Sequence, residues 1–218
     1  WMANGIHHHY SEDKILPKFS KEYFTTIVKS VDPGRMPFRD GMAADETLTE
    51  IVPVMFDPNI MPKRMNQAAG VDLIKTSAVN FYEGVTQKEV ENFYNKMKNP
   101  NDATPVSYGL NSKVVKKDGV VAEQVWKQGG MYDKAITRII GWLEKAAGVA
   151  ENEQQKAVIN TLIDFYKTGD LKTFDDYSIK WVSDTSSHVD FVNGFIETYA
   201  DPLGMKGSWE SIVNFKNI

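Results

Sequence analysis

Cysteine is absent from all 218 residues of the chain. This absence excludes disulfide bonds and thiolate ligands for a metal, because both need a cysteine sulfur. Long apolar runs are absent as well, since none approaches the ~20 residues that a membrane-spanning helix requires. No basic head followed by an apolar segment indicates a signal peptide. We therefore expect no membrane partner.

A strong charge of either sign is also missing. The net charge is −4 at pH 7, and the short basic pairs Lys63-Arg64 and Lys116-Lys117 are typical of a solvated face. No basic stripe indicates a nucleic-acid partner. With 42% apolar and 25% charged residues, the composition is that of an ordinary globular protein. The length suffices for one core, or for one core with a helical satellite.

Histidine is scarce, with four in the chain, and this limits the metal chemistry that the sequence can support. Zinc peptidases place two histidines and a glutamate on one helix face and add a third ligand. His7, His8 and His9 are consecutive, so at most two of them can face a single ion from a helix. His188 is the remaining histidine. We expect a surface or interdomain role for the three histidines, and no catalytic zinc assembled by this chain alone.

The N-terminal part is predicted to be helical and irregular. Ser20 is a suitable N-cap for an amphipathic helix that ends at Asp32-Pro33-Gly34. Residues 33–66 are rich in proline, and we expect an irregular segment there with at most one short helix, around Leu48–Met55.

The middle of the chain carries clearer local signals. Thr86-Gln-Lys-Glu89 is a capping box that begins another helix. Two β-prone runs follow, Val106–Lys117 and Val120–Trp126. They flank Asp118-Gly119, a dipeptide preferred in two-residue hairpin turns because both positions need a positive φ.

Helical spacing of apolar residues then predicts two helices, Ile136–Ala147 and Val158–Tyr166, whose short connection makes them an antiparallel pair. The final third is predicted to return to strands, at Val189–Tyr199 and Gly207–Phe215. This order indicates an α+β fold. We expect antiparallel β-hairpins that form a small mixed sheet or a partial barrel, with the helix pair packed against it.

Two carboxylates, Asp190 and Glu197, lie in a run otherwise built of Val, Phe, Ile and Tyr. Such a run favours a buried strand, where a carboxylate is costly unless a partner or a substrate cation meets it. In a regular strand, residues seven apart project to opposite faces. Each carboxylate is therefore either an anion held in a cleft for a substrate's free α-amino group, or half of a structural ion pair with Lys or Arg on a neighbouring strand.

The strand continues as G-F-I-E-T-Y-A-D-P-L-G-M-K-G, from Gly194 to Gly207. It resembles the (E/D)-x-x-x-G-F-I-E-x-Y-x-D-P-x-G-x-(K/R)-G stretch of the dipeptidyl peptidase III family of zinc exopeptidases. The resemblance implies that Asp190 receives the substrate's free α-amino group. The family places a tyrosine two residues after that acid, where it stabilises the oxyanion. Val192 stands at this position, so the oxyanion role is not carried over.

Other segments fit the same family. Ser107-Tyr-Gly-Leu-Asn-Ser-Lys113 resembles its (S/A)-Y-(G/N)-(L/T)-(N/R) stretch, which implies that Tyr108 and Asn111 line a peptide groove; a plain hairpin edge explains both equally well. Asn80-Phe-Tyr-x-Gly84 fits the pattern (N/Y)-F-x-x-G. The segment around the histidines matches the family at Asn4, Tyr10, Asp13, Lys14 and Pro17. The family's zinc signature, H-E-x-x-G-H followed by E-E-x-x-(A/G)-E, is missing from these residues.

The resemblance implies that residues 1–218 are a single lobe, the non-zinc, substrate-binding lobe of a cytoplasmic metallopeptidase. Such an enzyme removes dipeptides from the N-termini of short peptides by zinc-activated water. Within the lobe we expect a helical and irregular part at 1–100, and the hairpin, helix pair and terminal strands at 101–218. Zinc belongs to the missing lobe, which is the implied partner, and the chain alone is expected to be inactive. The alternatives are a stand-alone peptide-binding module and a structural α+β module without catalysis.

The first residues, Trp1-Met2-Ala3, read as the last turn of an apolar helix and suggest a piece cut from a longer chain. A lobe separated from the rest of its fold exposes the face that it buried there. We therefore expect a contiguous apolar patch near the Trp1 end or beside Trp209.

Overall fold

The computed structural model of the chain describes residues 5–36, 38 and 42–216. Trp1–Ala3, for which the sequence suggested the end of a helix, lie outside the described residues. The backbone divides into two compact units, Trp1–Ala78 and Val79–Ile218. The sequence suggested that the helical and irregular part ends near residue 100, but the division between the units falls earlier, after Ala78. The reason is that the helix near residue 90 packs with the strands that follow it.

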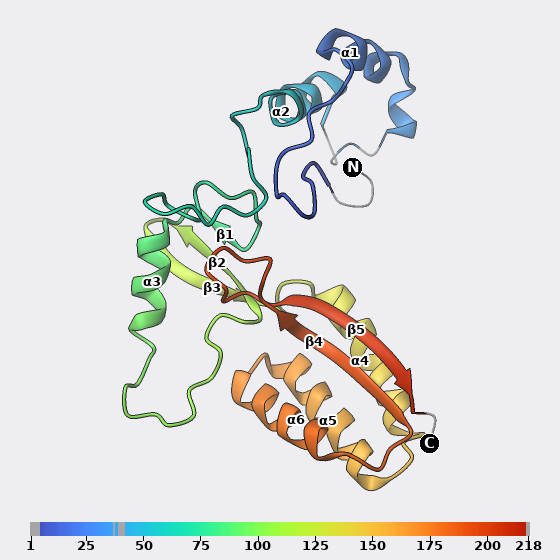
Figure 1. The fold of residues 1–218 in the computed structure, drawn as a ribbon. Helices are drawn as coiled ribbons and strands as arrows, with labels where there is room; N and C mark the ends of the chain where they lie inside the picture. Colours follow the sequence, from blue (N-terminus) through green and yellow to red (C-terminus); the bar gives the residue numbers. More distant parts are fainter. Residues whose placement is uncertain (1–4, 37, 39–41, 217–218) are drawn as a thin grey trace. The chain divides into compact units, whose positions relative to one another are not determined.

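The first unit contains two α-helices, α1 (Lys21–Ser30) and α2 (Ala44–Phe56), which lie side by side (Figure 1). As predicted, Ser20 caps α1, and its Oγ accepts a hydrogen bond from the Tyr23 amide at 3.1 Å. A short 3₁₀-helix, Pro33–Arg35, follows where the sequence predicted the end of α1. Helix α2 covers the predicted short helix and extends beyond it at both ends. The two helices contact each other through aromatic rings, and the ring centroids of Phe24 and Phe56 are 6.1 Å apart.

The second unit begins with a three-stranded mixed sheet in the order β1 (Tyr82–Glu83), β2 (Ser112–Lys117), β3 (Val120–Val125). Strand β1 pairs in parallel with β2, and β2 pairs antiparallel with β3. The hairpin turn is confirmed, since Asp118 and Gly119 have φ values of 51° and 80°. Helix α3 (Gln87–Asn95) begins at the predicted capping box. It contacts β3.

Strand β2 is shorter than the sequence predicted. It begins at Ser112 rather than at Val106, because the preceding residues turn back on themselves. The Leu110 amide donates to the Ser107 carbonyl at 3.1 Å, and Gly109 adopts a φ of +88° that side-chain-bearing residues rarely adopt. The residues that were assigned to a strand therefore form a tight turn before it.

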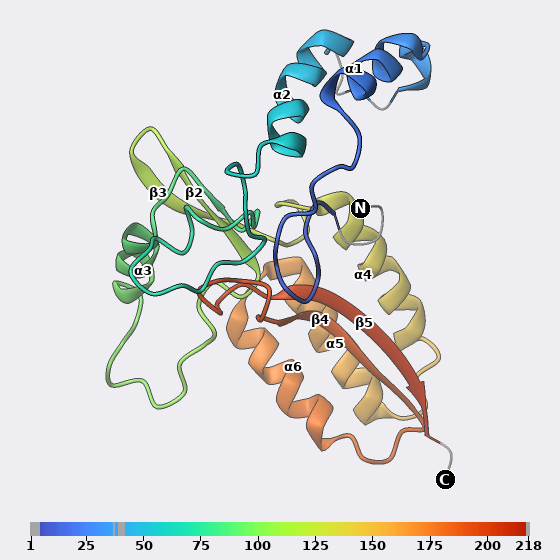
Figure 2. The same ribbon diagram turned by 45° about the horizontal axis from the view of Figure 1, so that its top comes forward.

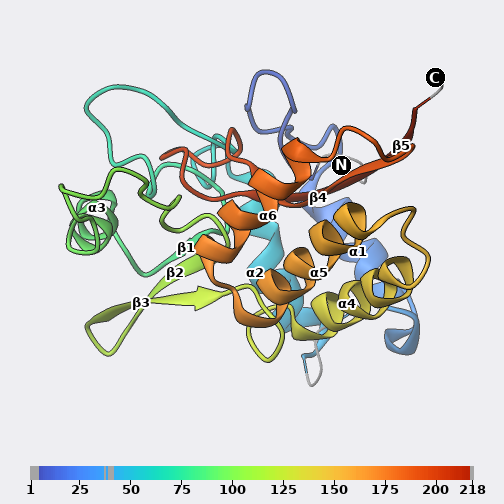
Figure 3. The ribbon, with the colours of Figure 1, turned by 90° about the horizontal axis from the view of Figure 1, so that it is seen from below.

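Three helices form the main layer of the second unit: α4 (Asp133–Ala147), α5 (Glu153–Thr168) and α6 (Leu171–Ser183). Viewed from below they lie in a row with α5 in the middle (Figure 3). The predicted pair is therefore a triplet, and the prediction missed α6. Helix α5 ends in the left-handed Gly169, and the next residue, Asp170, already caps α6 by accepting from the Thr173 amide at 3.0 Å.

A long antiparallel hairpin, β4 (Val189–Glu197) and β5 (Ser208–Phe215), lies across these helices (Figure 2). Its residue Phe195 is buried against Trp126, with ring centroids 4.9 Å apart, and joins the helices in one apolar core. The fold is α+β, as predicted, with sheets of three and two strands and no closed barrel among the described strands. No described helix combines the length and the apolar character needed to cross a bilayer.

Candidate functional site

The start of β4 is held by a single carboxylate from the loop before α5. Glu151 accepts hydrogen bonds from the amides of His188 and Val189 at 2.9 and 2.7 Å, and its carboxylate also contacts the His188 ring at 2.9 Å. These backbone amide donors lower the pKa of Glu151 to about 2. The charge of Glu151 thus fixes the position from which Asp190 projects.

Asp190 is partly buried, and its carboxylate meets an indole rather than a cation. Trp181 of α6 donates its Nε1–H to Asp190 Oδ1 at 3.0 Å, and the Phe191 amide donates to the same oxygen at 2.9 Å. Within the described ranges, no Lys or Arg side chain forms an ion pair with Asp190. The structural ion pair that the sequence left open for Asp190 is therefore not found among the described residues.

Glu197 lies at the other end of β4 and is exposed. Phe195 pairs with Trp209 and Glu197 pairs with Ser208, so one extra residue, Ile196, forms a β-bulge between them. A bulge cancels one alternation of the side chains along a strand. The expectation that Asp190 and Glu197 project to opposite faces is therefore wrong, because it assumed a regular strand.

Tyr108 and Asn111 lie in the turn before β2, and both are engaged by the fold. The Tyr108 hydroxyl donates to the Met97 carbonyl at 3.0 Å. Asn111 is 2% exposed, and its Nδ2 donates to the Gly169 carbonyl at 3.0 Å. The structure brings neither side chain together with Asp190 in a shared contact, and the proposed substrate contacts of Tyr108 and Asn111 stay predictions.

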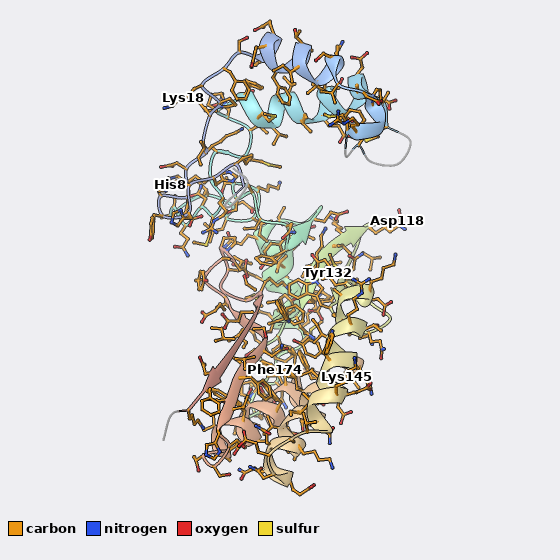
Figure 4. The ribbon with its side chains drawn as sticks, turned by 90° about the vertical axis from the view of Figure 1, so that its right-hand side faces the viewer. His8, Lys18, Asp118, Tyr132, Lys145 and Phe174 are labelled. Atoms are coloured by element: carbon orange, nitrogen blue, oxygen red, sulfur yellow. The ribbon has the colours of Figure 1, made fainter. Side chains whose placement is uncertain are left out.

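An apolar groove runs between α4 and the β4–β5 hairpin. Two adjoining hollows of about 480 and 610 Å³ share Arg138, Ile139 and Trp209. Helix α4 forms one wall, with Tyr132 and Lys145 labelled towards its two ends (Figure 4). The exposed apolar side chains along the groove include Trp142, Val149, Trp209 and Val213. The predicted apolar patch beside Trp209 is thus present, and the Trp1 end lies outside the described residues.

A chain of hydrogen bonds joins residues that line this groove to the buried Tyr166. Trp209 donates its Nε1–H to the Tyr166 hydroxyl at 2.9 Å, and Tyr166 in turn donates to Asn193 Oδ1 at 2.5 Å. Asn193 Nδ2 donates to Ser211 at 3.1 Å, across the hairpin. Burial raises the pKa of Tyr166, so the tyrosine stays a neutral donor. This chain orders the two strands above α5.

The residues that the structure describes do not form a site for a zinc ion. His7 is buried and its Nε2 bonds to the Met61 carbonyl at 2.8 Å, while the rings of His8 and His9 stack on each other at 5.3 Å. His188 contacts Glu151. Over the residues that the structure describes, no group of three His, Asp or Glu side chains is arranged to hold a metal.

One contact of the site escaped the sequence reasoning. Nothing in the sequence pointed to Trp181 as part of the site, yet its indole nitrogen is the donor that orients Asp190. The omission follows from missing α6. The Asp170 cap and the spacing of Leu171, Phe174 and Tyr177 could have revealed that helix.

Comparison with known proteins places the chain in a family. Residues 57–218 match the model of "Peptidase family M49". The chain is 25% identical to dipeptidyl peptidase 3 of Dictyostelium discoideum over 222 residues, which cover 95% of this chain and 30% of the relative. It is 31% identical to the human dipeptidyl peptidase 3 over 88 residues, covering 40% of this chain and 12% of the relative.

Solved structures show the same fold. Dipeptidyl peptidase III (DPP III) from Caldithrix abyssi superposes with a TM-score of 0.52 at 17% identity, over 90% of this chain and 34% of that one. The enzyme from Corallococcus sp. strain EGB gives a TM-score of 0.51 at 18% identity, with the same coverage. The chain spans about a third of the length of these structures and of the Dictyostelium relative. Because the family model matches most of its length, this chain belongs to peptidase family M49.

Proposed function

We propose that this chain is the substrate-binding, non-zinc lobe of a zinc-dependent dipeptidyl peptidase that removes dipeptides from the N-termini of short peptides. Membership of the peptidase family supports the reaction class, and the coverage of about a third of its relatives supports the role of a part. The observation that carries the proposal is the carboxylate of Asp190, which is held in place but has no cationic partner in the described part of the chain.

The chemistry of an exopeptidase explains why such an anion is useful. An enzyme that cuts after the second residue must measure its distance from the substrate's α-amino group, which is cationic near neutral pH. A carboxylate that accepts from this ammonium forms a charge-assisted hydrogen bond, which is stronger than a neutral one. In the proposal Asp190 accepts a hydrogen bond from the ammonium, and Glu197, on the same strand, adds negative charge near the bound peptide. In the same proposal, Tyr108 and Asn111 contact the backbone of the bound peptide.

The zinc ion is assigned to the part of the enzyme outside this chain, because the described residues do not form a site for it. Bound there, the metal would supply the activated water for peptide hydrolysis. The residues of this chain bind and orient the peptide, and no group at Val192 serves the oxyanion. The chain alone is therefore expected to be inactive.

Besides the peptide substrate, the proposal gives this chain a second partner, which is the zinc lobe with the rest of the polypeptide. The groove between α4 and the β4–β5 hairpin supports this part, because exposed apolar patches of this kind mark interaction surfaces. Strand β5 has its outer edge unpaired among the described strands, and such an edge offers backbone donors and acceptors to another chain segment. In line with the resemblance, we place the enzyme in the cytoplasm.

The experiment compares the full-length protein with the 218-residue chain. The full-length protein is expected to release dipeptides from dipeptidyl arylamides and to retain one zinc ion per chain after dialysis. The 218-residue chain is expected to do neither. A zinc-free full-length protein without this activity would instead support a stand-alone peptide-binding or structural module. Stoichiometric zinc in the 218-residue chain would contradict the proposal and would point to His7, His8 and His9 as zinc ligands.

A further inference from the structure

A buried lysine lies directly after the turn that joins β4 to β5. Lys206 is 0% exposed. Its Nζ donates to the Gly109 carbonyl at 3.0 Å and to Ser112 Oγ at 3.1 Å, and it also contacts the hydroxyl of Tyr94. These partners come from α3, and from the turn before β2 together with the first residue of that strand. One ammonium group therefore ties the end of the hairpin to two other segments of the same unit.

Two carboxylates compensate the buried charge of Lys206. Glu123 accepts from Tyr94 at 2.7 Å and from Ser112 at 2.5 Å, so its charge reaches Lys206 through both hydroxyls. Asp201 is 1% exposed and its Oδ2 accepts from the Lys206 amide at 2.9 Å. The pKa of Lys206 falls to about 8 because of burial, against the opposing effect of Glu123 and Asp201. Every member is paired, which is the condition for a stable buried network.

The turn itself is built around Asp201. The carboxylate accepts from the Met205 amide at 2.8 Å and from the hydroxyl of Tyr82 at 2.8 Å. Tyr82 belongs to β1, so the bond between its hydroxyl and Asp201 also connects the hairpin turn to the three-stranded sheet. The pKa of Tyr82 is raised by burial and by the neighbouring charge of Asp201. The hydroxyl therefore remains a donor.

The next residue, Gly207, connects this network to the bulge in β4. A Cβ on Gly207 would lie 2.7 Å from the Phe195 carbonyl carbon, closer than real Cβ atoms come, and 3.1 Å from the Ile196 amide nitrogen, which is tighter than most real contacts. The Gly207 amide donates to the Leu110 carbonyl at 2.8 Å. The backbone beside Lys206 is thus pressed against the bulge that precedes Glu197.

We propose that Lys206 is a positioning residue for Glu197. Its ammonium group anchors the turn, the anchored turn holds Gly207 against the bulge, and the bulge sets the side of β4 from which Glu197 projects. Bulges commonly re-aim a side chain at a functional site. The inference rests on the proposed function, because it gives Glu197 a substrate to meet, and Lys206 itself, being fully buried, touches no substrate.

Kinetics of the full-length peptidase test the proposal through a double-mutant cycle. Lys206→Met removes the ammonium and should lower kcat/KM about tenfold, mainly through KM, if Glu197 loses a charge-assisted contact. In a Glu197→Gln background the same change should cost less than about twofold, since residues that act through one another are not additive. Lys206→Arg keeps the charge and should restore most of the loss. Equal losses in both backgrounds would overturn the proposal.

A second variant perturbs the bulge without touching the buried charge, in case Lys206→Met does not fold. Gly207→Ala adds a methyl group against Phe195 and should also lower kcat/KM in a manner that depends on Glu197. Gly141→Ala is the matched control, because a Cβ at Gly141 in α4 meets nothing within 4 Å. Loss of activity that is equal for both alanine variants would contradict the role of the bulge.

Hydrogen exchange provides a readout that does not depend on catalysis. The amides of residues 195–197 should exchange at least about tenfold faster in Lys206→Met than in the parent, and Lys206→Arg should return towards the parent rate. Unchanged exchange at these amides would overturn the positioning role. If the full-length parent lacks dipeptidyl-peptidase activity, the proposed function fails, while the exchange rates still decide whether Lys206 holds the bulge.

Discussion

Replacing Asp190 with asparagine in the proposed full-length peptidase separates a role in substrate binding from a structural one. Asparagine has the same shape, and its Oδ1 can still accept from Trp181 and from the Phe191 amide. The change therefore removes the negative charge and leaves the local hydrogen bonds in place. We expect little change in melting temperature.

The magnitude follows from the charge-assisted hydrogen bond that the substrate's ammonium would lose. Such bonds contribute about 1.5–3 kcal/mol, and the partial exposure of Asp190 favours the lower end of this range. Because about 1.4 kcal/mol corresponds to a factor of ten in rate, kcat/KM should fall roughly tenfold for peptides with a free N-terminus. Peptides with an acetylated N-terminus lack the ammonium and should be cleaved at a nearly unchanged, low rate.

The assay measures kcat/KM for matched free and acetylated peptides, with Glu210→Gln as the control. Glu210 lies on the neighbouring strand β5 and pairs with Gly194, so this variant removes one charge from the same hairpin. It should leave the ratio between free and acetylated peptides unchanged. Equal losses for both peptides in Asp190→Asn, together with a lower melting temperature, would refute the reasoning and make Asp190 a structural residue.

Three further predictions concern stability and the exposed groove. The pKa of Lys206 is about 8 in the fold against 10.5 ordinarily, so the unfolded chain binds more protons than the folded one between these pH values. The free energy of unfolding, measured with urea, should therefore rise by about 1–2 kcal/mol from pH 8 to 9.5. A free energy that does not change with pH would contradict the burial of this charge. The pKa of Glu151 is lowered to about 2, so the stability from its bonds to the β4 amides should be lost as pH falls from about 4.5 to 2, and thermal melts of Glu151→Gln should lack this contribution. The 218-residue chain should bind a hydrophobic dye in the groove, with Val213→Thr lowering the emission more than Val120→Thr, a matched change on exposed β3; equal emission from both variants would contradict this location.

The sequence determined the elements that short-range chemistry specifies. Ser20 and Thr86 begin their helices because their hydroxyls accept from amides three residues further on. Asp118-Gly119 forms the hairpin turn because both residues adopt a positive φ. The resemblance to dipeptidyl peptidase III, read from the stretch at the end of the chain, led to the family that the comparison established. These signals lie within a few residues of one another, so no tertiary contact is needed to see them.

Only the tertiary structure decided the surroundings of the candidate site. The bulge at Ile196 reversed the expected direction of Glu197, and Asn111 proved to be buried against Gly169, 58 residues away. Lys206 reads in the sequence as an ordinary basic residue after a turn, yet it is enclosed by Tyr94, which precedes it by 112 positions. Contacts of this range depend on how helices and sheets pack, and neither periodicity nor turn chemistry carries that information.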